Sequence, residues 1–477
     1  MDLPFGTLTP DLDVLIVGAG LSGLASALKI LSMESTLKVR IIESSGCLGG
    51  QLGQDSIRFV DAAQQDMLAF LTLIQMSPRR RRHDNSRLRR CWDLDRGFTA
   101  LPAKFELGRY IEMLDLRMSK FRSKRFNLRE RVSNMEQHIC HHLFFNKSRN
   151  FMLNLVELVC GVPANEVDYD VFMSVCSSCG GLKKLIDFYF IYPSHFYEIS
   201  TQMLLEKILD QMQFTKISLN SRAVKLEHFK NYAQVTDDQG NKHTAQAVIL
   251  AIPWNKVQKL EFEPRIPRAF QPPVATKAGQ KPRRLITQFQ LRYGKSVWDN
   301  LGYSGNFLSS QPLVSGHESR PSTFCGYILH SPEDQDEVLG DVMDLLADHF
   351  GEEMRKPLDT QFSTDELNVA LHKPQTKPWY RVIWSSSSAV GTNYRSLMGG
   401  AVQSGFRAAV NALFVVRPQV VSWKDMLDER PKNLQESFRT GRLRGLLSRL
   451  NLYNVTFYSL FVLGLIWLLN FGYARAS

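Results

Sequence analysis

The sequence is poor in cysteine and is not hydrophobic enough for a multi-span membrane protein. Seven cysteines are scattered through 477 residues, at positions 47, 91, 140, 160, 176, 179 and 325. They are too few for a disulfide scaffold, so we expect a reducing compartment. The N-terminal residues lack a basic segment followed by an apolar one, and we expect no secretory signal peptide. With 44% hydrophobic and 22% charged residues, the chain should fold as a globular protein.

The sequence also largely lacks the spacing of cysteines and histidines that is typical of zinc sites. Cys176 and Cys179 form one Cys-x-x-Cys pair, and no second such pair accompanies it. A second group, His138, Cys140 and the adjacent residues 141–142, lies earlier in the chain. A structural zinc site needs four ligands, so we expect no bound metal.

Basic residues are present in excess and are concentrated in one stretch. The chain has 58 Lys plus Arg against 47 Asp plus Glu, a net charge of +11, and residues 79–131 alone hold 17 basic and 7 acidic residues. This stretch favours a solvated insertion loop; contact with anionic lipid headgroups and with nucleic acid are the alternatives. No nucleic-acid-binding motif accompanies the charge, so we expect no nucleic-acid partner.

The C-terminal end contains the one long uncharged run. Residues 450–474 carry no charge, and residues 455–473 are long enough as a helix to cross the hydrocarbon core of a bilayer. Arginines precede the run and Arg475 follows it. This pattern predicts a C-terminal membrane anchor after a basic membrane-proximal arm at 416–449, with the lipid bilayer as partner; a buried core helix is the alternative.

The N-terminal part reads as a strand, a glycine turn and a helix. A short apolar run at 13–17 leads into Gly18, Gly20 and Gly23, and helical apolar spacing follows. Gly18 would allow the tight turn, Gly20 the approach of a pyrophosphate, and Gly23 the close packing of helix on strand. The helix N-terminus would then face the anion.

A second strand and an acidic residue complete this dinucleotide-binding pattern. Residues 39–42 read as a second strand, and Glu43 follows them at the position of a carboxylate that accepts hydrogen bonds from a ribose hydroxyl. Gly49 and Gly50 lie just beyond, where a glycine pair continues the turn in flavoproteins. We therefore predict FAD rather than NAD.

Further pieces of the nucleotide domain occur downstream. Residues 223–226 and 247–253 read as strands around a polar hairpin at 237–241, residues 380–384 as a strand, and Met398 as the start of a glycine-rich helix. We predict a two-domain α/β fold with a Rossmann-type nucleotide domain, a mixed-sheet substrate domain and a C-terminal transmembrane helix. The nucleotide domain would comprise 12–60, 220–254 and 378–415, and the substrate domain 61–219 and 255–377.

Together these segments resemble the flavin-containing amine oxidases, and most closely the monoamine oxidases. The resemblance implies that FAD and O2 are used to oxidise a small-molecule amine to an imine or aldehyde with release of hydrogen peroxide. It also implies a mitochondrial outer membrane location facing the cytosol, with the endoplasmic reticulum as alternative, and a possible homodimer. The implied cofactor-binding residues are Gly18, Gly20, Leu21, Ser22, Gly23, Glu43, Gly50, Gln51, Val224, Ser386 and Met398.

The chain departs from this family at several functional positions. Gln288 stands where the family has the lysine that reaches the flavin through a water, and Leu397 replaces one tyrosine of the amine cage. Residues 371–380 leave no room for the flavin-linking cysteine, and Cys325 lies too far upstream, so we expect non-covalent FAD.

The cofactor loops depart from the family as well. Ser385 to Ser388 replace a Gly-Thr-Glu turn, Gln51 an arginine, and alanines 62 and 63 a glycine pair. Three interpretations therefore stay open: an oxidase with an altered substrate, a catalytically reduced membrane-bound binding or scaffold protein, and an NAD-linked or otherwise unrelated oxidoreductase.

Overall fold

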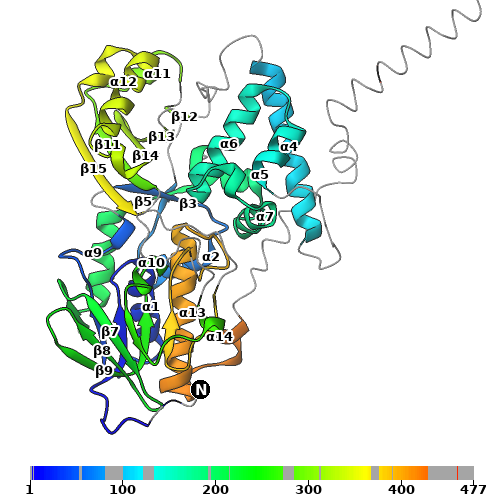
Figure 1. Cartoon of the computed structure of the whole chain (residues 1–477). Coiled ribbons are helices and arrows are strands. Elements are labelled where there is room, and N and C mark those ends of the chain that lie inside the picture. Colours follow the sequence, from blue (N-terminus) through cyan, green and yellow to red (C-terminus); the bar gives the residue numbers. More distant parts are fainter. Residues whose placement is uncertain are drawn as a thin grey trace, which may run out of the picture.

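The computed structural model shows a nucleotide-type sheet region, a helical group and a second sheet region, which meet around short central strands (Figure 1). It describes Leu3, residues 5–52, 56–80, 100–121, 134–191, 195–213, 215–271, 284–303, 305–310, 313–366, 375–388, 390–427 and Ser459. The predicted α/β architecture with mixed sheets is confirmed within these ranges.

The first sheet is built around β1 (Leu12–Val17), which pairs in parallel with β2 (Val39–Ile42) on one side and β9 (Lys242–Leu250) on the other. Its strand order is β10-β7-β8-β9-β1-β2-β6, and β16 pairs with the end of β9. The central strands are apolar because both sheet faces are covered. The outer strands are β6 (Lys216–Ser218), β7 (Ala223–His228), β8 (Ala233–Asp237), β10 (Glu261–Glu263) and β16 (Val382–Trp384).

This sheet draws its strands from three separate stretches of the chain, as a discontinuous nucleotide domain requires. β6 and β10 also join it, although both lie just inside the stretches assigned above to the substrate domain. The strand expected at 380–384 begins only at Val382, because Tyr380 has φ 52° and forms a turn closed by the Trp379 N–H and the Val382 carbonyl at 2.8 Å.

Helices α1 (Leu21–Met33) and α13 (Met398–Val416) pack closely against each other on this sheet. A Cβ at Gly405 would lie 2.5 Å from the Ser22 carbonyl oxygen, so only glycine permits this approach. The Ser26 hydroxyl donates to the Gly405 carbonyl at 3.1 Å. The contact holds the two helix N-termini at the same end of the sheet (Figure 1). Helices α2 (Gln65–Leu73), α9 (Thr201–Gln211), α10 (Trp254–Val257) and α14 (Trp423–Leu427) complete this half.

The other half contains an antiparallel sheet, a small connecting sheet and a helical group. The five-stranded order is β12 (Phe307–Ser310), β13 (Leu313–Arg320), β14 (Thr323–His330), β11 (Leu285–Arg292) and β15 (Asp359–Glu366), covered by α11 (Val297–Asn300) and α12 (Val338–Phe350). The connecting sheet is β3 (Ile57–Val60), β5 (Tyr197–Ser200) and β4 (Arg79–Arg80). The helices are α4 (Ala100–Phe121), α5 (Met135–His142), α6 (Asn146–Cys160), α7 (Tyr169–Ser178) and α8 (Leu182–Ile186).

The expectation of a solvated loop over the basic stretch is wrong for residues 100–121. These residues form α4, which packs on α6 and α8. Leu107, Tyr110, Leu114 and Met118 follow helical spacing and are buried, so an apolar stripe runs through the charged segment. Residues 81–99 and 122–133 lie outside the described residues.

Among the described helices, none has both the length and the apolar character needed to cross a bilayer. The predicted anchor at 450–474 lies outside the described residues apart from Ser459, and the arm at 416–449 is described only to residue 427. The anchor therefore stays a prediction from the sequence.

Candidate cofactor and active site

The three glycines of the turn after β1 differ in what surrounds them. Gly18 has φ 104°, and a Cβ there would lie 2.7 Å from the Ala251 carbonyl oxygen. A Cβ at Gly23 would lie 2.0 Å from the Gly18 carbonyl oxygen. In the described part of the chain, a Cβ at Gly20 would meet no atom within 4 Å. The space above Gly20 is thus open to a ligand while Gly18 and Gly23 are closed by the protein.

The N-terminus of α1 faces this space without a capping side chain from the described residues. Gly20 occupies the N-cap, the first turn contains no acidic residue, and Leu21 and Ser22 begin the helix as buried residues. The first N–H groups of a helix lack partners within the helix and carry the positive end of its dipole. This arrangement suits a phosphate group.

The second glycine pair lies directly against the first turn. Gly49 and Gly50 have φ 99° and 56°, and the Gly49 N–H donates to the Ala19 carbonyl at 2.9 Å. A Cβ at Gly50 would lie 3.2 Å from the Gly20 Cα. Gln51 follows as an exposed residue of a short 3₁₀ turn. Gly49 and Gly50 thus lie against the first turn, and their part in binding a dinucleotide stays a prediction.

Glu43 lies at the same turn, but the protein itself uses much of its carboxylate. One oxygen accepts the Ala19 N–H at 2.7 Å, and the other accepts the Ser45 N–H at 2.9 Å and the Ser45 hydroxyl at 3.0 Å. The Ser44 hydroxyl also donates to that second oxygen at 3.2 Å, so four protein donors already match the roughly four lone-pair sites of a carboxylate, and a ribose hydroxyl would take the place of one serine hydroxyl. The predicted ribose contact of Glu43 stays a prediction.

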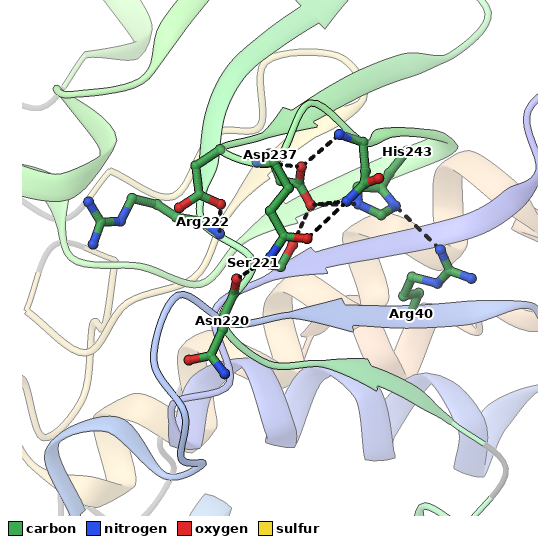
Figure 2. Close-up of polar contacts among 9 residues, drawn as sticks. Arg40, Asn220, Ser221, Arg222, Asp237 and His243 are labelled. Atoms are coloured by element: carbon green, nitrogen blue, oxygen red, sulfur yellow. Dashed lines mark hydrogen bonds and ion pairs between the residues drawn. The ribbon is translucent and has the colours of Figure 1, made fainter.

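A polar network supports the segment next to Glu43 (Figure 2). The Asp237 carboxylate accepts the Ser221 hydroxyl at 2.8 Å and the Asn241 side-chain and backbone N–H groups at 3.0 and 2.8 Å. The Ser221 N–H in turn donates to the Glu43 carbonyl at 2.8 Å. The network therefore ties the β8–β9 hairpin to the chain that carries the predicted ribose ligand.

The hydrogen bonds of this network keep the Asp237 carboxylate ionised. Burial alone would raise the pKa of Asp237, but hydrogen bonds from Asn241 and Ser221 lower it to about 2. The His243 Nε2 atom lies 3.7 Å from the carboxylate, and its Nδ1 atom faces the Arg40 guanidinium at 3.3 Å (Figure 2). Because the Ser221 hydroxyl donates to Asp237 rather than to His243, these residues do not form a nucleophilic triad.

Val224 lies three residues after Ser221 in the sequence and belongs to β7. The pairing of β7 with β8 changes register between Ala223 and Lys225, which leaves Val224 at an irregularity with an exposed side chain. This position is compatible with the predicted adenosine contact, which stays a prediction.

The segment before α13 folds tightly onto the helix N-terminus. The Ser387 hydroxyl donates to the Leu397 carbonyl at 2.8 Å, and the Ser386 carbonyl accepts the Val390 N–H at 3.0 Å. Met398 begins α13 as predicted, and the first turn again contains no acidic residue. The serine turn and the helix start are thus held together.

Gln64 is a residue of this region that the sequence did not reveal. Its buried side-chain oxygen accepts the Gly399 N–H at 3.1 Å, and a Cβ at Gly399 would lie 2.5 Å from that oxygen. The turn that carries Gln64 follows Asp61, whose buried carboxylate forms an ion pair with Lys184. No local pattern marks Gln64, because its partner is 335 residues away.

Gln288 is linked to the glycine region through Arg58. The Arg58 guanidinium donates to the Gln288 amide oxygen and to the Tyr327 hydroxyl. It also donates to the Leu52 carbonyl at 3.1 Å, just after the Gly49–Gly50 pair. The structure thus places a cation against Gln288, and sequence reasoning missed Arg58. Lys295, which follows β11 in the chain, pairs with Glu353 at 3.1 Å.

His138 and the Cys-x-x-Cys pair are packed into the helical core, whereas Cys140 and His141 are exposed. His138 stacks on His142 with ring centroids 4.2 Å apart and bonds the Tyr110 hydroxyl at 2.8 Å. Burial raises the pKa of Cys176 well above its usual range and that of Cys179 to about 12. Within the described ranges, no cluster of three or more His, Cys, Asp or Glu could hold a metal ion.

Several buried polar atoms of the described nucleotide half lack protein partners, and two of them lie on either side of the start of α13 in the sequence. The Ser385 hydroxyl and the Gln403 side-chain nitrogen make no hydrogen bond within the described structure, and both residues are nearly inaccessible to solvent. Buried polar groups are nearly always hydrogen-bonded in folded proteins. Together with the open space at Gly20 and the two uncapped helix starts, this fits a bound dinucleotide.

The chain is similar in sequence to a known protein family and to named relatives. The model of the family "Flavin containing amine oxidoreductase" matches residues 21–413. A protein of Mycobacterium tuberculosis that bears the name "Putative flavin-containing monoamine oxidase AofH" is 25% identical over 289 residues. The match covers 55% of this chain and 62% of the relative, so this chain spans less than two thirds of it.

Solved structures share the fold at low sequence identity. A putrescine oxidase variant with redesigned cofactor binding superposes with a TM-score of 0.66, covering 84% of this chain and 99% of that one, at 18% identity. Cyclohexylamine oxidase from Brevibacterium oxydans gives a TM-score of 0.65 with the same coverage and identity.

Proposed function

Because this chain belongs to the flavin-containing amine oxidoreductase family, we propose that it binds FAD without a covalent bond and oxidises a small-molecule amine with O2. The balanced reaction converts an amine and O2 to an imine and hydrogen peroxide, and water then hydrolyses the imine to an aldehyde and ammonia, or to an aldehyde and a smaller amine where the nitrogen is substituted. The observation that carries the proposal is the glycine turn, with space open above Gly20 at the uncapped N-terminus of α1. When bound, the flavin would supply the redox chemistry.

The residues around the turn would hold the cofactor. Gly18 to Gly23 and Gly50 would receive the pyrophosphate, Glu43 the ribose and Val224 the adenosine end. Ser386, Gln51 and Met398 would line the remaining part. Ser385 and Gln403 supply buried polar groups that a ligand can satisfy.

Gln288 is the candidate residue for the reaction itself. Arg58 occupies its amide oxygen, which leaves the amide nitrogen as a hydrogen-bond donor towards a water or a neutral amine. Gln288 would orient that group rather than act as a base, because an amide does not accept a proton at neutral pH.

The environment of Cys325 supports non-covalent binding. The thiol is buried in β14 and lies 3.0 Å from the Ser319 hydroxyl. Burial raises the pKa of Cys325 to about 11, so the nucleophilic thiolate is scarce at neutral pH.

The alternative is a catalytically reduced protein that keeps the fold and acts as a membrane-bound binding or scaffold protein. The observation that favours it is the neutral Gln288 bound to Arg58 in place of a basic side chain. Anaerobic addition of a panel of amines to the flavin-loaded protein distinguishes the two. Bleaching of the flavin absorbance supports the oxidase, and a flavin that no amine bleaches supports the alternative.

We further propose that residues 450–474 anchor the chain in the mitochondrial outer membrane with the rest of the chain in the cytosol, and that the protein forms a homodimer. The uncharged run and the arginines before it support the anchor. Family resemblance supports the location and the dimer, and the endoplasmic reticulum is the alternative location. Microscopy of the tagged full chain against markers of both membranes tests the location.

A further inference from the structure

Arg395 is a buried cation in the segment between β16 and α13. Only 2% of the residue is exposed. Its Nη2 atom donates to the Ser388 carbonyl at 2.8 Å. Its Nε and Nη1 atoms, which carry three N–H donors, find no hydrogen-bond partner in the described structure.

The protein provides no counter-charge for this guanidinium within the described residues. No ion pair with an aspartate or glutamate is formed there. The titratable neighbours are the thiols of Cys160 and Cys179, and burial raises the pKa of each to about 12, so both are neutral. Burial lowers the pKa of Arg395 to about 10, which still leaves it protonated at neutral pH.

An unpaired buried charge is strongly unfavourable unless a ligand compensates it. A solely structural arginine would normally have its N–H groups satisfied by carbonyls or a carboxylate. The free donors of Arg395 therefore indicate an oxyanion that joins the protein on binding. Guanidinium groups bind carboxylates and phosphates through short charge-assisted hydrogen bonds.

The position of Arg395 identifies which oxyanion is available. Its backbone N–H donates to the Ser178 hydroxyl at 3.3 Å at the end of α7, in the substrate half. The preceding Tyr394 donates from its hydroxyl to the Ala63 carbonyl at 2.9 Å. These two contacts lie in the substrate half, and Met398, three residues after Arg395, begins α13 of the nucleotide half. Arg395 therefore lies where the two halves meet. The proposed function already assigns the cofactor pyrophosphate to the glycine turn after β1.

We propose that Arg395 binds a carboxylate of the substrate, so that the amine taken by this protein also carries an acid group. The inference rests on the proposed amine oxidase function and narrows its substrate class. The guanidinium holds the acid end of the molecule by charge and hydrogen bonds, and the amine end remains free for oxidation.

The test uses the full-length flavin-loaded protein with benzoate as the probe and benzamide as its uncharged counterpart. Binding is measured by perturbation of the flavin spectrum and by the shift of Tm. We expect benzoate to bind at least about tenfold more tightly than benzamide, since charge-assisted bonds are about twice as strong as neutral ones. Arg395→Met should abolish that preference. Its Tm without ligand should be equal or higher, because an uncompensated buried charge has been removed.

Arg381→Met is the matched control. Arg381 is partly buried, and its Nε and Nη1 atoms already donate to the Lys230 and Gln246 carbonyls at 2.8 Å each. This variant should keep the benzoate preference. Arg395→Lys, which keeps the charge, should retain part of it and serves if the methionine variant does not fold.

Three results overturn the proposal. The first is equal binding of benzoate and benzamide by the natural protein, and the second is unchanged benzoate binding in Arg395→Met. The third is selective loss of flavin from Arg395→Met but not from Arg381→Met, which assigns the guanidinium to the cofactor. If the natural protein lacks flavin altogether, the oxidase proposal fails; a benzoate-dependent Tm shift that disappears in Arg395→Met would still support the carboxylate site.

Discussion

The Arg58 guanidinium donates a hydrogen bond to the Gln288 side-chain oxygen across a sequence separation of 230 residues. The contact joins β3 of the connecting sheet to β11 of the five-stranded sheet, and a further bond from Arg58 reaches the Leu52 carbonyl beside the second glycine pair. A cation therefore lies where the nucleotide half and the substrate half meet.

This contact predicts the effect of introducing a lysine at position 288. Gln288→Lys places an ammonium group against the Arg58 guanidinium, so we expect a loss of about 1–2 kcal/mol in the free energy of unfolding. Adding Arg58→Gln should recover part of that loss, because the repulsion is removed. Urea unfolding of the two single variants and the double variant gives the coupling energy. A strictly additive double variant would contradict the contact.

Gly20 and Gly23 of the glycine turn should respond differently to the same substitution. Gly20→Ala adds a methyl group in open space and at an extended backbone conformation, so the chain should fold with an unchanged Tm without cofactor. The methyl group would meet the incoming pyrophosphate, and FAD affinity should fall by about tenfold or more. Fluorescence titration with FAD measures this loss.

Gly23→Ala is the partner of that experiment. Its methyl group would lie 2.0 Å from the Gly18 carbonyl oxygen, so the turn or the helix must move. We expect a stability loss of about 1–3 kcal/mol, as for other overpacked sites. Equal effects of the two alanines on folding and on FAD binding would contradict the assignment of the open face to Gly20.

Asp237 predicts an acid-dependent contribution to stability. Its folded-state pKa of about 2 lies below the unfolded value near 3.8, so its contribution is fully present above about pH 4. It is lost as the pH falls from about 4 towards 2. Asp237→Asn should cost about 2 kcal/mol at pH 7, and the difference from the natural chain should shrink on acidification. Urea unfolding of both proteins across this pH range tests the sign; a difference that grows on acidification would contradict it.

Truncation tests the predicted anchor. A chain that ends at Arg449 lacks the uncharged run and should appear in the soluble fraction of cell lysates, while the full chain should sediment with membranes and resist extraction by carbonate. Replacing the run with a foreign hydrophobic helix is the control, and it should restore sedimentation. Sedimentation of the truncated chain with membranes would contradict the prediction.

The sequence was informative where a feature is local. β1, β2 and the start of α13 could be predicted because strands buried on both faces are apolar runs and because glycines mark the places where backbone or ligand approaches closely. Arg58, Gln64 and Arg395 could not be predicted, because their roles depend on partners brought together by the fold. For Gln64 that partner is the Gly399 N–H. Helix α4 was missed because its apolar stripe lies within a stretch dominated by charge.

The central claim is that the turn from Gly18 to Gly23 holds FAD without a covalent bond. The most direct measurement is the visible spectrum of the purified full chain, followed by acid precipitation and analysis of the supernatant for FAD. The account predicts flavin absorbance in stoichiometric amount, with all of the FAD released into the supernatant. A well-folded preparation that contains no flavin and takes none up from solution would contradict it.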